Sequence, residues 1–154
     1  MKTFTLLLSG LFTSSFFAAA SLQAQECKKE QAKAIVEKAC GLANSEANEA
    51  AAKSAVQKLR YCGSNYVWLQ DEAVKMVMHP IKPRLNGKDL KDNKDEKGKK
   101  LFVEFDKMAN ANADGGWVEY YWAKPGAEKA TPKVSFVKKC GKYGWIAGSG
   151  IWTN

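Results

Sequence analysis

His79 is the only histidine in the chain, and it is weighed first because imidazole is the commonest acid-base group near neutral pH. A serine-histidine-aspartate arrangement would have to use this one side chain, and no nucleophile-elbow motif is present. A catalytic pair of carboxylates would have to come from scattered residues such as Glu104 and Glu119. The residue types therefore argue against an enzyme, and we expect no cofactor.

Cysteine supplies the second kind of chemistry. Zinc sites usually contain closely spaced cysteine and histidine pairs, whereas the two nearest cysteines here, Cys27 and Cys40, are 13 positions apart. An even number of cysteines in a short exported chain is typical of disulfides. We therefore expect two disulfides among Cys27, Cys40, Cys62 and Cys140, and no metal site.

Aromatic residues recur at every second position in two segments, as Tyr66 and Trp68 and again as Tyr120 and Trp122. This spacing places each pair on one face of a strand. The simplest interpretation is that these rings fill the core. Buried tyrosine hydroxyls nevertheless need hydrogen-bond partners, so an aromatic wall of a polar pocket is the alternative.

The elements that would position these residues fall into two parts. Residues 26–60 are rich in alanine and contain no tryptophan, tyrosine or proline, which predicts two helices. We expect the first helix to end near Cys40, because Gly41 suits a left-handed helix end, and the second to begin at Asn44 or Ser45.

The second part is rich in strands. Aromatic and β-branched residues between turn residues predict five strands, with one helix between the second and third whose apolar face contains Leu101, Phe102, Phe105 and Met108. The expected strands cover residues 65–70, 74–79, 117–123, 134–138 and 145–152.

The first residues are typical of a secretory signal, with Lys2 before an apolar stretch and small residues after it. We expect cleavage after Ala24, with Ala20 as the alternative; retention as a membrane anchor is disfavoured because the stretch is short and interrupted. The formal net charge is +8, but lysines and acidic residues alternate through 88–100, which argues against nucleic acid.

Several motifs follow one another in a familiar order, and together they resemble the single Cache domain family. They are Tyr66-Val67-Trp68, Val77-Met78-His79-Pro80, Gly87-Lys88-Asp89-Leu90, Leu101-Phe102-Val103-Glu104-Phe105, Trp117-Val118, Lys124-Pro125-Gly126, residues 132–138 and residues 145–151. Six or so motifs in register are more specific than any one of them. Ala123 departs from the family pattern, which commonly has proline there, and the four cysteines are not part of it.

The resemblance implies an α+β, PAS-like fold with a five-stranded antiparallel sheet in the order 2-1-5-4-3. The N-terminal helices would pack on one face and a small pocket would lie on the other. We therefore expect a signal peptide at 1–24 and a single Cache domain at 25–154, with helices over 25–61 and the sheet and pocket over 62–154.

Single Cache domains usually lie outside the membrane in chemoreceptors and sensor kinases, where many bind short carboxylates. A carboxylate would be held by ammonium, hydroxyl and imidazole donors among aromatic rings. The pocket residues we expect on this basis are Tyr66, Trp68, Met78, His79, Tyr120, Trp122, Lys124, Lys133 and Ser135.

The expected fold also suggests the disulfide pairing. Two antiparallel front helices would bring Cys27, at the start of the first, near Cys62, at the end of the second. That pairing leaves Cys40 with Cys140, at the start of the last hairpin.

The sequence thus predicts a periplasmic or secreted module, not membrane-spanning after signal cleavage, that binds a small organic anion and acts with a separate membrane-bound receptor or transporter. The alternative is a structural or protein-interaction module that kept the scaffold without a ligand.

Overall fold

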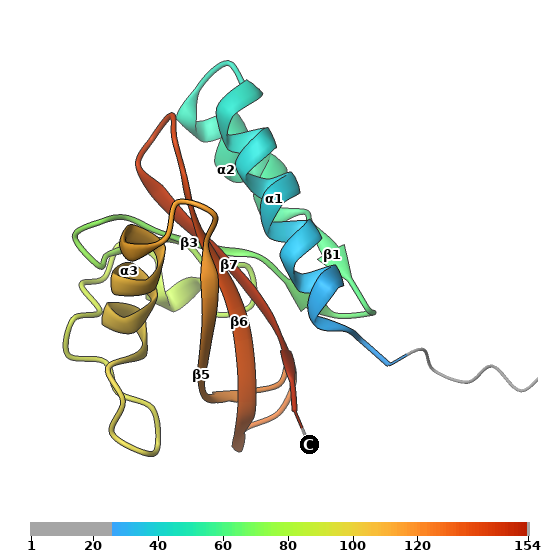
Figure 1. Cartoon of the computed structure of the whole chain (residues 1–154), viewed down its shortest axis with the longest axis vertical. Helices are drawn as coiled ribbons and strands as arrows, with labels where there is room; N and C mark the ends of the chain where they lie inside the picture. The colour runs from blue at the N-terminus through green and yellow to red at the C-terminus, as the bar shows by residue number, and fades with distance from the viewer. Residues whose placement is uncertain (1–25, 154) are drawn as a thin grey trace, which may run out of the picture.

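The computed structural model describes residues 26–153, so the expected signal peptide and its cleavage site lie outside the described residues. Three α-helices, one short 3-10 helix and seven strands follow one another in this part of the chain (Figure 1). They are α1 Lys29–Ser45, α2 Glu49–Gln57, β1 Arg60–Tyr61, β2 Asn65–Tyr66, β3 Trp68–Gln70, β4 Met76–Met78, η1 Pro83–Leu85, α3 Leu101–Ala111, β5 Gly116–Ala123, β6 Ala130–Cys140 and β7 Trp145–Trp152.

The main sheet has five antiparallel strands in the order β4-β3-β7-β6-β5. The expected order 2-1-5-4-3 is the same arrangement, counted in the five predicted strands, and is therefore confirmed. The first predicted strand is divided: β2 pairs with β1 in a separate two-stranded ribbon, and only β3 joins the main sheet. The sequence did not predict this ribbon.

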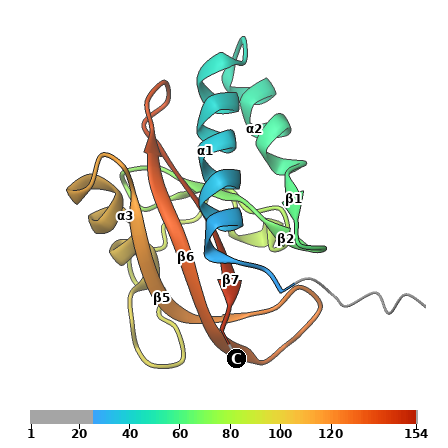
Figure 2. The same ribbon diagram turned by 45° about the vertical axis from the view of Figure 1, so that its right-hand side comes forward.

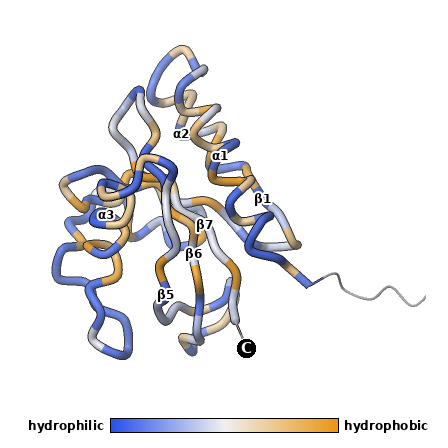
Figure 3. The backbone as a smooth tube through the Cα atoms, viewed as in Figure 1, coloured by the Kyte–Doolittle hydropathy of each residue, from blue (hydrophilic) through white to orange (hydrophobic). Residues whose placement is uncertain are grey.

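Helices cover the two faces of the sheet unequally. The helices α1 and α2 lie together on one face, where α1 packs on β6 and β7, and α3 lies on the other (Figures 1 and 2). Each face has its own apolar core, one centred on Val36, Val67 and Phe136 and the other on Trp68, Phe105 and Tyr120. The loop that precedes α3 is mostly hydrophilic (Figure 3).

The prediction of the first two helix boundaries was wrong. Helix α1 continues through Gly41 to Ser45, and Gly41 is not among the residues with positive φ. The extra turn buries Ala43 in the core, which favours continuing the helix over ending it. Helix α2 begins later, after Asn48, whose side-chain oxygen accepts a hydrogen bond from the backbone N–H of Ala51 at 3.0 Å.

Both disulfides connect the predicted partners. Cys27 is bonded to Cys62 and Cys40 to Cys140, over sequence separations of 35 and 100. The first ties the start of α1 to the turn of the β1–β2 ribbon, and the second ties the middle of α1 to the end of β6. The helical layer is therefore covalently fixed to the strands at two points.

Candidate ligand-binding site

Strand pairing brings the predicted site residues onto the face that α3 covers. Lys133 on β6 lies directly opposite Tyr120 on β5 and opposite Trp152 on β7, so these three side chains form one row across the sheet. Trp68 on β3 lies opposite Gly148 on β7, where an added Cβ would fall 2.1 Å from the indole. Glycine at 148 is thus required for Trp68 to lie flat over β7.

The rings on this face form a continuous group, which we call the aromatic cluster: Tyr66, Trp68, Phe102, Phe105, Tyr120 and Trp122. Trp68 and Phe105 have their centroids 4.6 Å apart, and Phe105 meets Tyr120 edge-on at 4.9 Å. Such tilted and edge-on contacts stabilise a core beyond the area that they bury. Together with Leu101 and His79, the rings leave no volume large enough for a water molecule between them.

Two hydrogen bonds satisfy the polar atoms of the aromatic cluster. The Trp122 indole N–H donates to the Tyr66 hydroxyl at 3.0 Å, and the hydroxyls of Tyr120 and Ser135 are 2.9 Å apart. Burial raises the pKa of both tyrosines well above the usual value, so they remain protonated hydrogen-bond donors at any physiological pH.

Lys133 is the unusual residue of the site, because an ammonium group is rarely buried without a carboxylate. The side chain is 2% exposed, and its Nζ lies 4.1 Å from the ring centroid of Trp152, 4.7 Å from that of Tyr66 and 6.0 Å from that of Tyr120. No carboxylate of residues 26–153 forms an ion pair with it. Desolvation, with a smaller effect of the Lys82 charge, lowers the pKa of Lys133 to about 7.

His79 lies between the rings of Tyr66 and Trp122, with centroids 4.9 and 6.0 Å away. Its Nδ1 accepts hydrogen bonds from the backbone N–H groups of Lys82 at 3.0 Å and Ile81 at 3.3 Å. Burial first, and then the charges of Lys133 and Lys82, lower the pKa of His79 to about 3. The imidazole is therefore neutral, and its proton resides on Nε2, which is left as a donor.

The structure brings together seven of the nine predicted site residues and separates two. Met78 lies in the core under α1 and α2, because the pairing of β3 with β4 shifts by one residue, so that Leu69 faces Met78 while Gln70 faces Met76. Such a bulge inverts the alternation of side chains, and Met76 takes the place on the aromatic face. Lys124 is exposed and lies outside the cluster.

Sequence reasoning did not assign Phe102, Phe105, Trp152 and Lys82 to the site. The spacing of the two phenylalanines on one helix face was noticed, but only as core. Trp152 is the last residue of the fifth predicted strand, and its pairing with Lys133 identifies it as part of the site only in the structure. Nothing in the sequence distinguished Lys82, whose Nζ lies 4.2 Å from the Trp122 ring centroid.

Lys133 and Tyr120 also reach the surface side of the site. They line a hollow of about 450 Å³ together with Asp95, Lys97 and Lys99 from the loop before α3. This loop is held against β5 by Asp95, whose Oδ2 accepts the Tyr121 backbone N–H at 3.0 Å.

Metal and membrane features are absent from the part of the chain that the structure describes. Within residues 26–153, no three histidine, cysteine, aspartate or glutamate side chains gather as a metal site would need. Among the same residues, no helix has the length and apolar character to cross a bilayer.

An antiparallel five-stranded sheet with paired N-terminal helices on one face and a donor-lined aromatic cluster on the other defines a PAS-like sensory domain. A family model named dCache_2, described as Cache domain, matches residues 19–154. The chain belongs to the Cache domain family. The family and the fold are those of small-molecule sensory domains and not of enzymes.

Two curated relatives are receptors of the same kind. The chain is 37% identical over 116 residues to the methyl-accepting chemotaxis protein McpP of Pseudomonas putida, covering 75% of this chain and 21% of the relative. It is 31% identical over 94 residues to the sensor histidine kinase MctS of Rhizobium johnstonii, covering 61% and 20%. The chain thus spans about a fifth of the length of these relatives.

Solved structures agree with this assignment. A structure described as a periplasmic sensor domain of a chemotaxis protein superposes with a TM-score of 0.76 at 38% identity, covering 82% of this chain and 95% of that one. A second, described as "Structural basis for carboxylic acid recognition by a Cache chemosensory domain", superposes with a TM-score of 0.74 at 33% identity, covering 82% and 93%.

Proposed function

We propose that this chain is a periplasmic or secreted sensory module that binds a small organic carboxylate at Lys133 and acts with a separate membrane-bound receptor or transporter. The observation that carries the proposal is the buried Lys133 ammonium, which has aromatic neighbours but no carboxylate of the described chain. Carboxylic acid recognition by the similar solved Cache domain supports the same ligand class.

The recognition we propose uses the donors that converge on this point. The ammonium of Lys133 would form a charge-assisted hydrogen bond with one carboxylate oxygen, and the hydroxyl of Tyr120 and Nε2–H of His79 are candidate donors to the other. The surrounding rings exclude water and so strengthen the ionic contact. A ligand of two to four carbons matches a site whose apolar part is already filled by side chains.

Binding requires side chains to move, because Lys133 is 2% exposed and the rings around His79 leave no free volume between them. We propose that the ligand enters from the hollow lined by Lys133 and Tyr120 and displaces the ring contacts of the ammonium. The cost of this displacement is limited, since cation–π contacts are individually weak compared with a desolvated ion pair.

The test is a comparison of two lysine variants against acetate, propionate, butyrate and succinate. Lys133→Met should weaken the binding of the best acid by about 10- to 150-fold, as expected for loss of a charged hydrogen bond. The free variant should melt at the same or a higher temperature, because methionine fills the space without a buried charge. Titration calorimetry and thermal melts measure both quantities.

Lys124→Met is the matched control, since Lys124 is exposed and lies away from the aromatic cluster. It should bind the same acid as tightly as the unaltered chain. Equal loss of affinity in both variants, or unchanged affinity in Lys133→Met, would contradict the assignment of the site.

A second candidate function is a structural or protein-interaction module without a small ligand. The observation that favours it is the filled aromatic cluster, in which the ammonium already contacts three rings. It predicts that no acid raises the melting temperature of the unaltered chain even at millimolar concentration, whereas a ligand at 100 times its Kd would stabilise the fold by about 2.7 kcal/mol.

A further inference from the structure

The two disulfides differ in their access to solvent. Cys40 and Cys140 are 7% and 1% exposed and lie in the core beneath α1. Cys62 is exposed and Cys27 half-buried, and both line a surface hollow of about 560 Å³ together with Lys124 and Trp152. Thiol–disulfide exchange requires an attacking thiolate to reach a sulfur atom. Only the Cys27–Cys62 bond meets this requirement in the folded protein.

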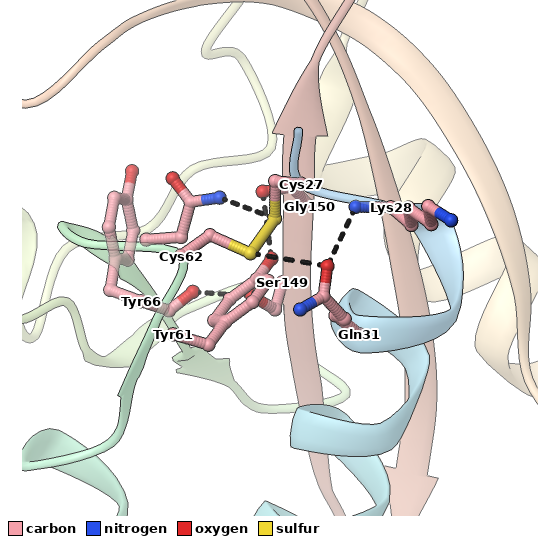
Figure 4. Close-up of a disulfide and its surroundings, with 9 residues drawn as sticks. Cys27, Lys28, Gln31, Tyr61, Cys62, Tyr66, Ser149 and Gly150 are labelled. Atoms are coloured by element: carbon pink, nitrogen blue, oxygen red, sulfur yellow. Dashed lines mark hydrogen bonds between the residues drawn. A yellow bond between two sulfur atoms is a disulfide. The ribbon is translucent and has the colours of Figure 1, made fainter. Parts of the chain in front are cut away.

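The exposed bond joins the residue before the N-cap of α1 to the turn of the β1–β2 ribbon (Figure 4). On the helix side, Gln31 Oε1 accepts the Lys28 backbone N–H at 2.9 Å and lies 3.4 Å from the Cys62 sulfur. On the ribbon side, the Asn65 amide donates to the Cys27 sulfur at 3.4 Å. The bond therefore ties the ribbon covalently to the start of the helix.

The ribbon in turn positions Tyr66 of the proposed site. The Tyr61 hydroxyl donates to the Gly150 carbonyl oxygen at 2.9 Å and lies 3.0 Å from Ser149 Oγ, which donates to the Tyr66 carbonyl oxygen at 2.6 Å (Figure 4). Tyr66 then contacts Trp122 and Lys133 through its side chain. A continuous set of contacts therefore runs from the exposed disulfide to the buried ammonium.

Cys62 lies in the turn between β1 and β2, in a backbone conformation that residues with a side chain rarely adopt. Its φ is 44°, in the left-handed region that disfavours residues with a side chain, and Gly63 follows with φ 79°. The bond to Cys27 is one of the constraints on this turn, together with the pairing of Tyr61 with Asn65. Loss of the bond would therefore leave the turn, and β2 with it, less constrained.

We propose that Cys27–Cys62 is a thiol–disulfide exchange site whose reduction weakens carboxylate binding at Lys133, an inference that rests on the proposed function. A thiolate of a dithiol reductant attacks the exposed Cys62 sulfur and forms a mixed disulfide with it. The Cys27–Cys62 bond breaks, and Cys27 leaves as a thiolate that takes up a proton. The second thiol of the reductant resolves the mixed disulfide. Two cysteine thiols and one oxidised dithiol result, so the two electrons are balanced.

The first measurement establishes which bond reacts. The folded chain is incubated with increasing dithiothreitol, free thiols are alkylated, and the alkylated cysteines are identified by mass spectrometry. We expect alkylation of Cys27 and Cys62 while Cys40 and Cys140 remain bonded. Simultaneous reduction of both bonds, or reduction of Cys40–Cys140 first, would overturn the proposal.

The second measurement compares the affinity of the oxidised and selectively reduced chains for acetate, propionate, butyrate and succinate. We expect the affinity to fall by at least about fivefold on reduction, the lower end of typical coupling between sites. The double variant Cys27→Ser with Cys62→Ser should reproduce the reduced value without any reductant. Circular dichroism checks that both forms remain folded.

The outcomes separate this inference from the proposed function. If the oxidised chain binds an acid and reduction leaves its affinity unchanged, the exchange site does not control the ligand site. If the oxidised chain binds none of the four acids, the proposed function is contradicted, and hydrogen exchange decides the inference. Reduction must then speed the exchange of the Tyr66 and Gly150 amides, and unchanged rates would overturn it.

Discussion

At the scale of single residues, the feature with the widest consequences is a pair of buried bases without acidic partners. Lys133 and His79 lie on the same face, and each is held toward its neutral form by burial and by neighbouring positive charge. Titration of Lys133 therefore affects ligand affinity above about pH 7, and titration of His79 affects the stability of the fold in acid.

Carboxylate binding at Lys133 should weaken as the pH rises above about 7. The ligand binds the protonated form of Lys133, and the pKa of Lys133 in the free chain is lowered to about 7. Above pH 7 the lysine must therefore be protonated before the ligand binds, and the free-energy cost of this protonation grows with each pH unit. The affinity should fall by up to about tenfold per unit. Calorimetry in buffers with different ionisation enthalpies would show proton uptake near zero at pH 6 and near one at pH 8.5. An affinity that does not vary between these values contradicts the prediction.

His79 should reduce stability in acid. Its pKa is about 3 when folded and 6.5 as a free group, so between these values the unfolded chain binds more protons. The free energy of unfolding therefore falls as the pH drops, by up to about 1.4 kcal/mol per unit from this residue alone. His79→Gln keeps an acceptor for the loop N–H groups but does not titrate, and its denaturant-derived stability should vary less between pH 6.5 and 4. Equal slopes in both chains would rule out this role.

Single residues also show where sequence reasoning succeeds. Period-two spacing is enough to place Tyr66, Trp68, Tyr120 and Trp122 on one face, since strand alternation is a local property. Lys82 carries no such signal, because its approach to Trp122 depends on the path of the loop after β4. Lys133 is predicted as a site residue from its position beside the turn between the third and fourth predicted strands, together with the aromatic pocket that the resemblance implies.

At the scale of elements, the β-bulge in β4 decides which side each methionine takes. Met78→Ala should cost about 2–5 kcal/mol of stability by opening a cavity under α1, and carboxylate affinity should be unchanged. Met76→Ala removes the same atoms on the aromatic face and should alter both quantities. Denaturant unfolding and calorimetry distinguish them. Loss of affinity in Met78→Ala alone would mean that the face assignment is wrong.

Asp95 fixes the part of the loop before α3 that lies against β5. Asp95 accepts the backbone N–H groups of Lys97, Lys99 and Tyr121, each at 2.9–3.0 Å. Asp95→Ala should therefore speed hydrogen exchange at these three amides and lower stability by about 1–3 kcal/mol. Asp92→Ala is the control, because Asp92 is exposed and pairs only with Lys100 on the surface. Comparable changes in both variants would argue against a specific role for Asp95.

The sequence predicted the type of the main helices and strands correctly, but it predicted some of their boundary residues wrongly. The strand order and the third helix follow from patterning and from the resemblance. The end of α1 was misplaced because Gly41 permits a helix end without requiring one, and the packing of Ala43 decides the matter. The bulge in β4 and the division of the first strand depend on contacts between distant segments, which local spacing does not encode.

At the scale of the whole molecule, the two disulfides close loops of different length. The chain-entropy relation gives about 4.7 kcal/mol for Cys40–Cys140 and about 3.8 kcal/mol for Cys27–Cys62. Replacing Cys40 and Cys140 with alanine should therefore destabilise the chain more than the same change at Cys27 and Cys62. Denaturant unfolding of the two double variants tests this order, and a reversed order would contradict it.

The pairing also bears on how the chain is made. A chain that leaves the ribosome or the export channel N-terminus first presents Cys27, Cys40 and Cys62 before Cys140. An oxidase that acts on cysteines in their order of appearance would join Cys27 to Cys40. In the folded protein Cys40 is instead bonded to Cys140, 100 residues later. Biosynthesis of this small domain should thus depend on a disulfide isomerase, and yield in a cell without one should fall through mispaired forms.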